Sequence, residues 1–455
     1  MKRTSIAGLA AVAVLAAAVV APTPEPSPDR RPNVILVVTD DQAFETLPSD
    51  AMPWLRARLA EAGGGWTLFP NAFSSTPMCC PARATLLTGR YSFHTGVHDN
   101  LDGEALDETR TLAVWLDEAG FTTGLVGKYL NDYPWTRGPY VPPGWDRWYA
   151  KLNPKLATTY VNFPVVDQAV PTIVRGAYAT DVLAAEAVEF VHAAPSDHPF
   201  FLLFAPSAPH APRTPAPRHV GTLRDLPVPA LAQLNDVDDA ATWARNLPTI
   251  DPPRAERISD ARERARETLL AVDEALHEIV TEVEARGQLD RTVILVLSDN
   301  GISFGEHRWV GKGCPYEACV RTPFAIRVPG SAGGVSESLA SNVDVAPTIA
   351  DLIGMELPPS VDGISLVPLL GDGATAERDG VLLTYVGDQR VPAWWAVRTD
   401  DWKYVTYADA SRELYDLRND PNELDNLAAD RAVAHVVTEL SDLLFALSGG
   451  RSDGR

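Results

Sequence analysis

The sequence predicts an α/β fold, with a large domain around a mostly parallel central sheet and a smaller C-terminal domain around an antiparallel sheet. Residues 33–38 (NVILVV) and 292–297 (TVILVL) are nearly all-apolar runs rich in β-branched residues, typical of central parallel strands covered on both faces. Residues 262–285 carry apolar side chains three and four positions apart, which indicates an amphipathic helix. From about Gly380 the chain changes to short alternating segments, the pattern of antiparallel strands.

The same patterns place the remaining elements. Residues 200–204 form a third apolar run, and Gly287 ends the long helix. Residues 211–260 are rich in proline and lack apolar periodicity, so we expect an irregular surface excursion there. The C-terminal elements are expected as strands at residues 381–385, 394–398, 402–407 and 413–417 and a helix near 431–447. A boundary near residue 375 divides the chain into domains of residues 33–375 and 376–455.

Composition indicates a globular protein and argues against some partners. Of the 455 residues, 45% are hydrophobic and 22% are charged, unlike a disordered or fibrous chain. The net charge of −21 repels nucleic acids and anionic membrane surfaces. We therefore expect no nucleic-acid partner and no stable membrane partner. The same charge disfavours a long polyanionic ligand unless a local cluster of cations overrides it.

Residues 1–21 are typical of a signal peptide. A positively charged start precedes an apolar run of alanine, valine and leucine, and small residues allow cleavage after Ala21 or nearer Ala18. A retained membrane anchor is the alternative, although the run is short for a transmembrane helix. Residues 22–32, rich in proline and charge, are predicted to be an extended linker. We therefore expect an exported protein, either secreted or held in a periplasm or at the cell surface.

Polar side chains follow two of the predicted strands at the point where each strand ends. Asp40 and Asp41 come after the first run, and Asp299 and Asn300 come after the late one. In open α/β sheets, ligands lie beyond the carboxyl ends of the strands, so these four side chains are expected at one site. Their oxygens are ligands that hard cations take, although either pair alone is more typical of a helix cap or a solvated turn.

The most informative motif is CCPAR at residues 79–83, followed by TGR at residues 88–90. Pro81 suits a first helical turn and Gly89 suits a helix end. Cys79 is then left at the positive N-terminal end of a helix, where an anion is stabilised.

This motif resembles the signature of the sulfatase family, and the likeness spans roughly residues 32–430. The resemblance implies an alkaline-phosphatase-like α/β/α sandwich. It also implies that Cys79 is oxidised to formylglycine by a formylglycine-generating enzyme. The hydrated aldehyde carries two hydroxyls: one attacks sulfur and expels the alcohol, and the other then expels sulfate. A buried structural thiol at Cys79 is the alternative.

The resemblance assigns further roles around Cys79. Four residues are implied to hold one calcium ion together with the modified Cys79: Asp40, Asp41, Asp299 and Asn300. Four cationic residues are implied to be catalytic: Arg83, Lys128, His210 and Lys312. Arg83 orients the formylglycine, the two lysines bind sulfate, and His210 lies near the leaving oxygen, where an imidazolium can protonate it. A solvated surface charge is the alternative reading of either lysine.

Residues 127–145 (GKYLNDYPWTRGPYVPPGW) are similar to the branch of N-acetylglucosamine-6-sulfatases and extracellular heparan endosulfatases. Many sulfatases carry a histidine where this chain has Leu130, so Asn131 is expected to substitute as a hydrogen-bond donor to the substrate, which Lys128, His210 and Lys312 also bind. His307 lies five residues before Lys312, and it either reaches the site or is structural.

We therefore expect a sulfuric ester hydrolase that acts on a sulfated carbohydrate of the glucosamine-6-sulfate type or on an aryl sulfate. One alternative is a phosphonate or phosphate ester hydrolase on the same scaffold. Another is a non-catalytic, calcium-dependent binder of sulfated glycans. Cys314 and Cys319 either form a disulfide in an oxidising compartment or remain free.

Overall fold

The computed structural model describes residues 29–47, 49–152, 159–223, 231–371 and 378–451. The expected signal peptide, most of the linker and the domain boundary near residue 375 lie outside these residues. The boundary therefore stays a prediction. Within the described ranges, no helix combines the length and the apolar character that a membrane span requires.

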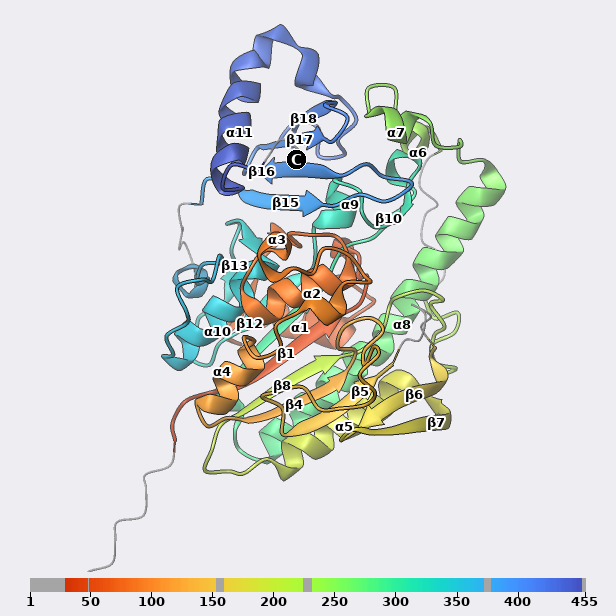
Figure 1. Ribbon diagram of the computed structural model, residues 1–455. Helices are drawn as coiled ribbons and strands as arrows, with labels where there is room; N and C mark the ends of the chain where they lie inside the picture. The colour runs from red at the N-terminus through yellow and green to blue at the C-terminus, as the bar shows by residue number, and fades with distance from the viewer. Residues whose placement is uncertain (1–28, 48, 153–158, 224–230, 372–377, 452–455) are drawn as a thin grey trace, which may run out of the picture.

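A ten-stranded sheet forms the centre of the molecule (Figure 1). From one edge to the other its strands are β13 (Gly334–Val335), β2 (Trp66–Leu68), β12 (Phe324–Arg327), β9 (Thr292–Ser298), β1 (Asn33–Thr39), β8 (Phe200–Ala205), β4 (Thr122–Gly127), β5 (Arg147–Lys151), β6 (Val161–Asp167) and β7 (Val170–Tyr178). The five middle strands, from β9 to β5, are all parallel. The antiparallel pairs lie toward the two edges. The expectation of a mostly parallel central sheet is confirmed.

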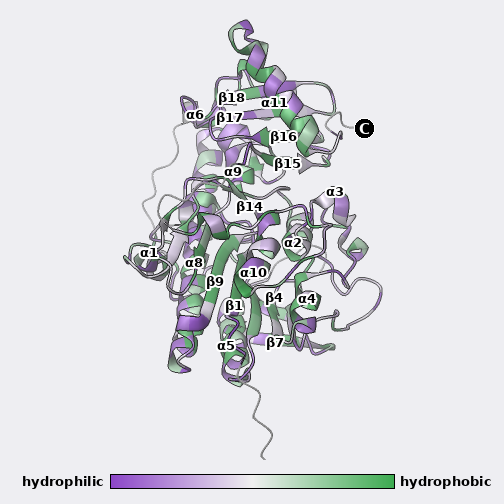
Figure 2. Ribbon diagram, turned by 90° about the vertical axis from the view of Figure 1, so that its left-hand side faces the viewer, coloured by the Kyte–Doolittle hydropathy of each residue, from purple (hydrophilic) through white to green (hydrophobic). Residues whose placement is uncertain are grey.

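Helices cover both faces of this sheet. Alternate residues of β1 point to opposite sides, and every one of them is buried, which explains the uninterrupted apolar run. Val34, Leu36 and Val38 pack with α2 (Cys79–Thr88), α4 (Leu112–Glu118) and α10 (Val345–Ile353). Ile35 and Val37 pack with α1 (Pro53–Leu59), α5 (Ala179–Ala193) and α8 (Pro252–Ala285). Figure 2 shows the hydrophobic central strands between these two layers, as an α/β/α sandwich requires.

A second, four-stranded antiparallel sheet follows near the C-terminus. It comprises β15 (Val381–Tyr385), β16 (Trp394–Arg398), β17 (Trp402–Tyr407) and β18 (Arg412–Asp416). The last helix, α11 (Ala434–Leu447), packs on one face of this sheet (Figure 1). The other face packs against residues 309–320 of the larger part of the molecule. The predicted strands agree with these four to within one residue at each end.

One expectation was wrong. Residues 252–260 are not irregular, because α8 begins at Pro252, ten residues before the predicted start. Asp251 caps the helix by accepting a hydrogen bond from the backbone N–H of Arg254 at 2.9 Å, and the two prolines that follow fit its first turn. Thus the prolines that indicated a loop are a helix start.

The remaining elements are short. Helices of four or five residues are α3 (Ser92–Thr95), α6 (Leu231–Asn235), α7 (Thr242–Arg245) and α9 (Glu317–Val320). Two small sheets pair β10 (Ser303–Phe304) with β11 (Val310–Gly311) and β14 (Ala340–Ser341) with β3 (Ala72–Phe73).

Candidate functional site

The carboxyl ends of β1 and β9 bring the two acidic pairs together. The strands are in register up to Thr39 and Ser298, so the residues that follow them meet. The backbone N–H of Asp41 donates to Oδ1 of Asp299 at 3.1 Å, and Asp41 has a left-handed φ of 63°. All four side chains that were predicted as metal ligands from these strand ends are buried.

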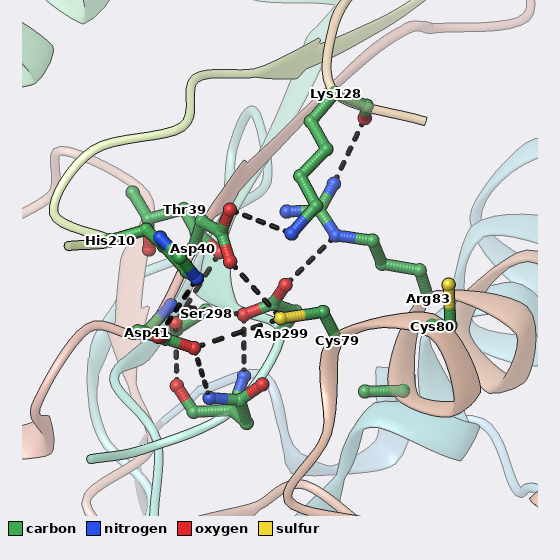
Figure 3. A network of polar contacts seen from close by, with 12 residues as sticks. Thr39, Asp40, Asp41, Cys79, Cys80, Arg83, Lys128, His210, Ser298 and Asp299 are labelled. Atoms are coloured by element: carbon green, nitrogen blue, oxygen red, sulfur yellow. Dashed lines mark hydrogen bonds and ion pairs between the residues drawn. The ribbon is translucent and has the colours of Figure 1, made fainter. Parts of the chain in front are cut away.

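Cys79 is the first residue of α2, and Gly89, with a φ of 63°, ends that helix, as predicted. Its Sγ lies 3.3 Å from Oδ1 of Asp40 and 3.8 Å from Oδ1 of Asp41 (Figure 3). The backbone N–H of Cys80 donates to Oδ1 of Asn100 at 3.0 Å, which satisfies one of the free amide groups in the first turn. The helix therefore presents Cys79 to the acidic pairs from its positive end.

Three cationic side chains neutralise these carboxylates. Lys128 Nζ donates to Oδ2 of Asp40 at 2.7 Å, and Arg83 Nε donates to Oδ2 of Asp299 at 2.8 Å (Figure 3). Lys312 Nζ lies 2.7 Å from Oδ1 of Asp41 and 2.6 Å from the sulfur of Cys79. These groups form one network of alternating charges, in which Lys312 is half-buried and the others are buried.

His210 completes the network at its solvent side. Its Nε2 lies 3.6 Å from Oδ2 of Asp41. Its Nδ1 lies 2.7 Å from the carbonyl oxygen of Ala211, a hydrogen bond in which Nδ1 carries the proton. The ring thus directs Nε2 toward the acidic pair, so this nitrogen is available to hold or transfer a proton there.

Burial and charge set the protonation states in the network. Burial opposes ionisation of Asp40, but the charges of Lys128 and the other cations outweigh it and hold the pKa of this carboxyl well below its usual range. Burial, together with the charge of Asp40, raises the pKa of the Cys79 thiol well above its ordinary value. Near neutral pH an unmodified Cys79 is therefore a protonated thiol, which is a weak nucleophile.

The oxygen donors among these residues fit a hard divalent cation. Ligand atoms from Asp40, Asp41, Cys79 and His210 all lie within 4.8 Å of one another. The amide nitrogen of Asn300 donates to Oδ1 of Asp41 at 2.7 Å, whereas its buried Oδ1 has no hydrogen-bond partner among the residues that the structure describes. A buried oxygen without a donor is costly unless a cation or another donor meets it. Carboxylate and amide oxygens are the ligands that calcium takes.

The structure therefore brings most of the predicted residues to one place. The network contains Asp40, Asp41, Cys79, Arg83, Lys128, His210, Asp299, Asn300 and Lys312. Asn131 lies one step behind it, because its backbone N–H donates to the sulfur of Cys80 at 3.0 Å. Its proposed contact with substrate stays a prediction.

His307 takes a structural position. It is 2% exposed, and its ring stacks on Tyr316 with 3.7 Å between ring centroids. Burial lowers the pKa of His307 to about 3, so the imidazole is neutral. Nearby, Cys314 and Cys319 form a disulfide, which settles the alternative that the sequence left open.

Two contributors were missed. Gln42, directly after the acidic pair, donates its backbone N–H to Oγ of Ser298 at 2.9 Å and joins the two strand ends. Its position in the sequence was the available signal. Asn100, which caps α2 through Cys80, follows no motif, and only tertiary structure places it there.

Comparison with known proteins identifies the family of this chain. The profile of the Sulfatase family matches residues 32–355, and a profile described as N-sulphoglucosamine sulphohydrolase, C-terminal, matches residues 305–449. The chain is 32% identical to the N-acetylglucosamine-6-sulfatase of Homo sapiens over 391 residues, which cover 79% of this chain and 68% of that protein. It is 34% identical to the extracellular sulfatase SULF-1 homolog of Drosophila melanogaster over 371 residues, 77% of this chain and 32% of that protein. The chain thus spans about a third of the length of the Drosophila relative.

One solved structure is similar along nearly the whole chain. It is described as a complex with its substrate, D-glucosamine-2-N,6-O-disulfate. The TM-score is 0.80 at 25% sequence identity, and the match covers 93% of this chain and 99% of the other.

Proposed function

The chain belongs to the sulfatase family, and from that premise we propose that it releases inorganic sulfate from a sulfated amino sugar, with formylglycine at residue 79 and one calcium ion. One observation carries the proposal. The side chain of Cys79 lies at the positive end of α2, between the carboxylates of Asp40 and Asp41 and the ammonium of Lys312. This place suits the attacking group of an anionic ester, whereas the protonated thiol itself is a weak nucleophile.

The residues around position 79 divide the work. Formylglycine, hydrated to a diol, would supply one hydroxyl to attack sulfur as the bond to the alcohol breaks; the second hydroxyl would then lose its proton as the carbon–oxygen bond to sulfate breaks, which restores the aldehyde. Calcium would be held by Asp40, Asp41, Asp299 and Asn300 with residue 79, and it would supply positive charge that offsets the charge of the sulfate.

The cationic side chains have separate tasks in this proposal. The ammonium groups of Lys128 and Lys312 bind the sulfate oxygens. Arg83 holds Asp299 and Lys128 in position, since its guanidinium donates to the Asp299 carboxylate at 2.8 Å and to the carbonyl oxygen of Lys128 at 2.9 Å. His210 acts in this proposal as an imidazolium: its Nδ1–H stays bound to the Ala211 carbonyl oxygen, and its Nε2–H is given to the departing alkoxide.

Similar proteins support an amino sugar as the substrate. The human relative is an N-acetylglucosamine-6-sulfatase, and the similar solved structure holds a sulfated glucosamine. We extend this substrate class to the present chain and keep an aryl sulfate as the second possibility. Asn131 is proposed to contact the substrate from the segment that carries the sequence likeness.

We also propose export through the N-terminal segment and maturation by a formylglycine-generating enzyme. The disulfide between Cys314 and Cys319 supports an oxidising compartment. A relative named as an extracellular sulfatase is consistent with it.

The test is turnover by protein produced together with a formylglycine-generating enzyme. Sulfate released from glucosamine 6-sulfate and from 4-nitrophenyl sulfate is measured beside phosphate released from 4-nitrophenyl phosphate. Cys79→Ala should lose turnover. The matched control is Cys80→Ser, which changes the adjacent buried cysteine but keeps an acceptor for the Asn131 N–H, and it should retain turnover. Faster cleavage of the phosphate ester than of the sulfate ester would indicate a phosphate ester hydrolase instead of a sulfatase. Binding of sulfated sugar without turnover of any ester would indicate a non-catalytic glycan binder.

A further inference from the structure

Lys312 is held in place by the C-terminal sheet. The indole N–H of Trp394, on β16, donates to the carbonyl oxygen of Gly313 at 2.9 Å. The indole N–H of Trp309 donates to the carbonyl oxygen of Lys312 at 3.2 Å. Both tryptophans are buried. Two consecutive carbonyl groups at the catalytic lysine are therefore fixed by indole donors, one of them from the second sheet.

Further contacts restrict the same turn. Gly313 has a φ of +90°, a conformation that favours glycine. The ring of Tyr385, on β15, closes the space beside it, since a Cβ added at Gly313 would lie 3.1 Å from the ring. Cys314, the next residue, is tied to Cys319 by the disulfide. The backbone around Lys312 thus has little freedom to move.

This restraint matters because of what the Lys312 side chain does. Its Nζ lies between Asp41 and Cys79, at 2.7 and 2.6 Å, on a four-carbon stem with many rotamers. The backbone position of Lys312 decides whether the ammonium reaches both groups. A misplacement of about 1 Å at a reacting centre can cost up to about 10²-fold in rate.

We propose that Trp394 is a positioning residue for the reaction: its indole N–H fixes the carbonyl group of Gly313, one residue after Lys312, and so places the ammonium against residue 79. This inference rests on the proposed function, and it gives the C-terminal sheet a part in the catalytic step. Trp394 acts through Lys312 and does not itself contact the reacting atoms.

The neighbouring residue supplies a matched control. Trp395 follows Trp394 on β16, so it points to the opposite face of the sheet. There it packs in the cluster with α11, away from Lys312. Trp394→Phe and Trp395→Phe are the same chemical change on the two faces of one strand. Only the first removes a hydrogen bond to the lysine turn.

The first readout is steady-state kinetics with glucosamine 6-sulfate. Trp394→Phe should lower kcat about tenfold, with a smaller change in KM, because the Lys312 ammonium is displaced from its position beside residue 79. Trp395→Phe should stay within about twofold of the parent protein in both constants, since Trp395 packs with α11 on the other face of the sheet. Equal kcat values for the two variants would overturn the proposal.

The second readout does not require activity. Trace acetylation by acetic anhydride, followed by peptide mass spectrometry, measures the reactivity of Lys312 relative to the fully buried Lys403. Trp394→Phe should raise the relative rate at Lys312 at least about threefold, and Trp395→Phe should not change it, because only the first frees the turn. Unchanged labelling of Lys312 in Trp394→Phe would overturn the positioning role of Trp394, whether or not the parent protein is active. A parent protein that turns over no sulfate ester would defeat only the proposed function.

A third variant decides the matter if Trp394→Phe does not fold. Trp309→Phe removes the other indole donor, on the carbonyl of Lys312 itself. Like Trp394→Phe, it should lower kcat and raise the labelling of Lys312. Parent-like values of both in Trp309→Phe would overturn the idea that indole donors position this lysine.

Discussion

Replacing Arg83 with methionine should destabilise the protein by about 3–5 kcal/mol, the usual result of removing one partner of a buried ion pair. The structure shows why the loss is large. The side chains of Arg83 and Asp299 are 5% and 0% exposed, and Nε lies 2.8 Å from Oδ2. The variant also removes the hydrogen bond to the Lys128 carbonyl oxygen at 2.9 Å. Methionine fills most of the space but leaves the Asp299 carboxylate without its counter-charge.

A double-mutant cycle separates the ion pair from simple packing. In Arg83→Met/Asp299→Asn neither buried charge remains, so the double variant should be about 2 kcal/mol more stable than the sum of the two single losses predicts. The free energy of unfolding is measured by urea titration in the presence of a chelator, with tryptophan fluorescence as the signal. The chelator keeps metal binding from contributing.

Arg218 provides the exposed control. Its guanidinium binds Asp181 at 2.7 and 2.9 Å and Glu274 at 2.6 and 2.8 Å, but the three side chains are 43–44% exposed. Arg218→Met should therefore cost at most about 1 kcal/mol. If Arg83→Met costs no more than Arg218→Met, or if the cycle shows no coupling, the buried network is not held as described here.

Other predictions address the metal, the proton donor and the pH dependence. Calcium at about 100 times its dissociation constant should stabilise the protein by about 2.7 kcal/mol, and Asn300→Ala should reduce this gain in thermal melts; no gain in the parent protein would contradict the metal site. His210→Ala should lower kcat about 10²- to 10⁴-fold on glucosamine 6-sulfate but less on 4-nitrophenyl sulfate, whose leaving group needs less help; equal losses would remove His210 from proton transfer. Burial raises the pKa of Asp273, which caps α1, from 3.8 to about 6. The folded protein therefore keeps a proton that the unfolded chain releases, so the stability from this group is full below pH 3.8 and is lost as the pH rises through about 6. Asp273→Asn should reduce the change in the free energy of unfolding across this pH window by up to about 3 kcal/mol. An unchanged dependence on pH would show that another group causes it.

Much of the fold and site followed from local patterns in the sequence. A strand buried on both faces must be apolar throughout, so residues 33–38 and 292–297 marked the middle of the sheet. Their polar ends marked Asp40, Asp41, Asp299 and Asn300, because parallel strands deliver their carboxyl ends to one edge. The motif at residues 79–83 added Cys79, which we propose as the source of the attacking group.

The features that the sequence did not reveal depend on contacts between distant segments. Nothing in the local pattern of Trp394 shows that its indole reaches Gly313, 81 positions away. His307 lies near Lys312 in the chain, yet its ring packs on Tyr316, and spacing alone does not determine that direction. The start of α8 was missed for another reason: prolines indicate both loops and first helical turns, and the capping Asp251 distinguishes the two.

The proposed mechanism depends on formylglycine at residue 79. The most direct measurement is the peptide mass across residues 76–83 of protein produced together with a formylglycine-generating enzyme. Conversion of the Cys79 thiol to an aldehyde predicts a loss of about 18 Da on that peptide, in the same preparation that releases sulfate. An unmodified thiol in a preparation that releases sulfate at full rate would contradict the account.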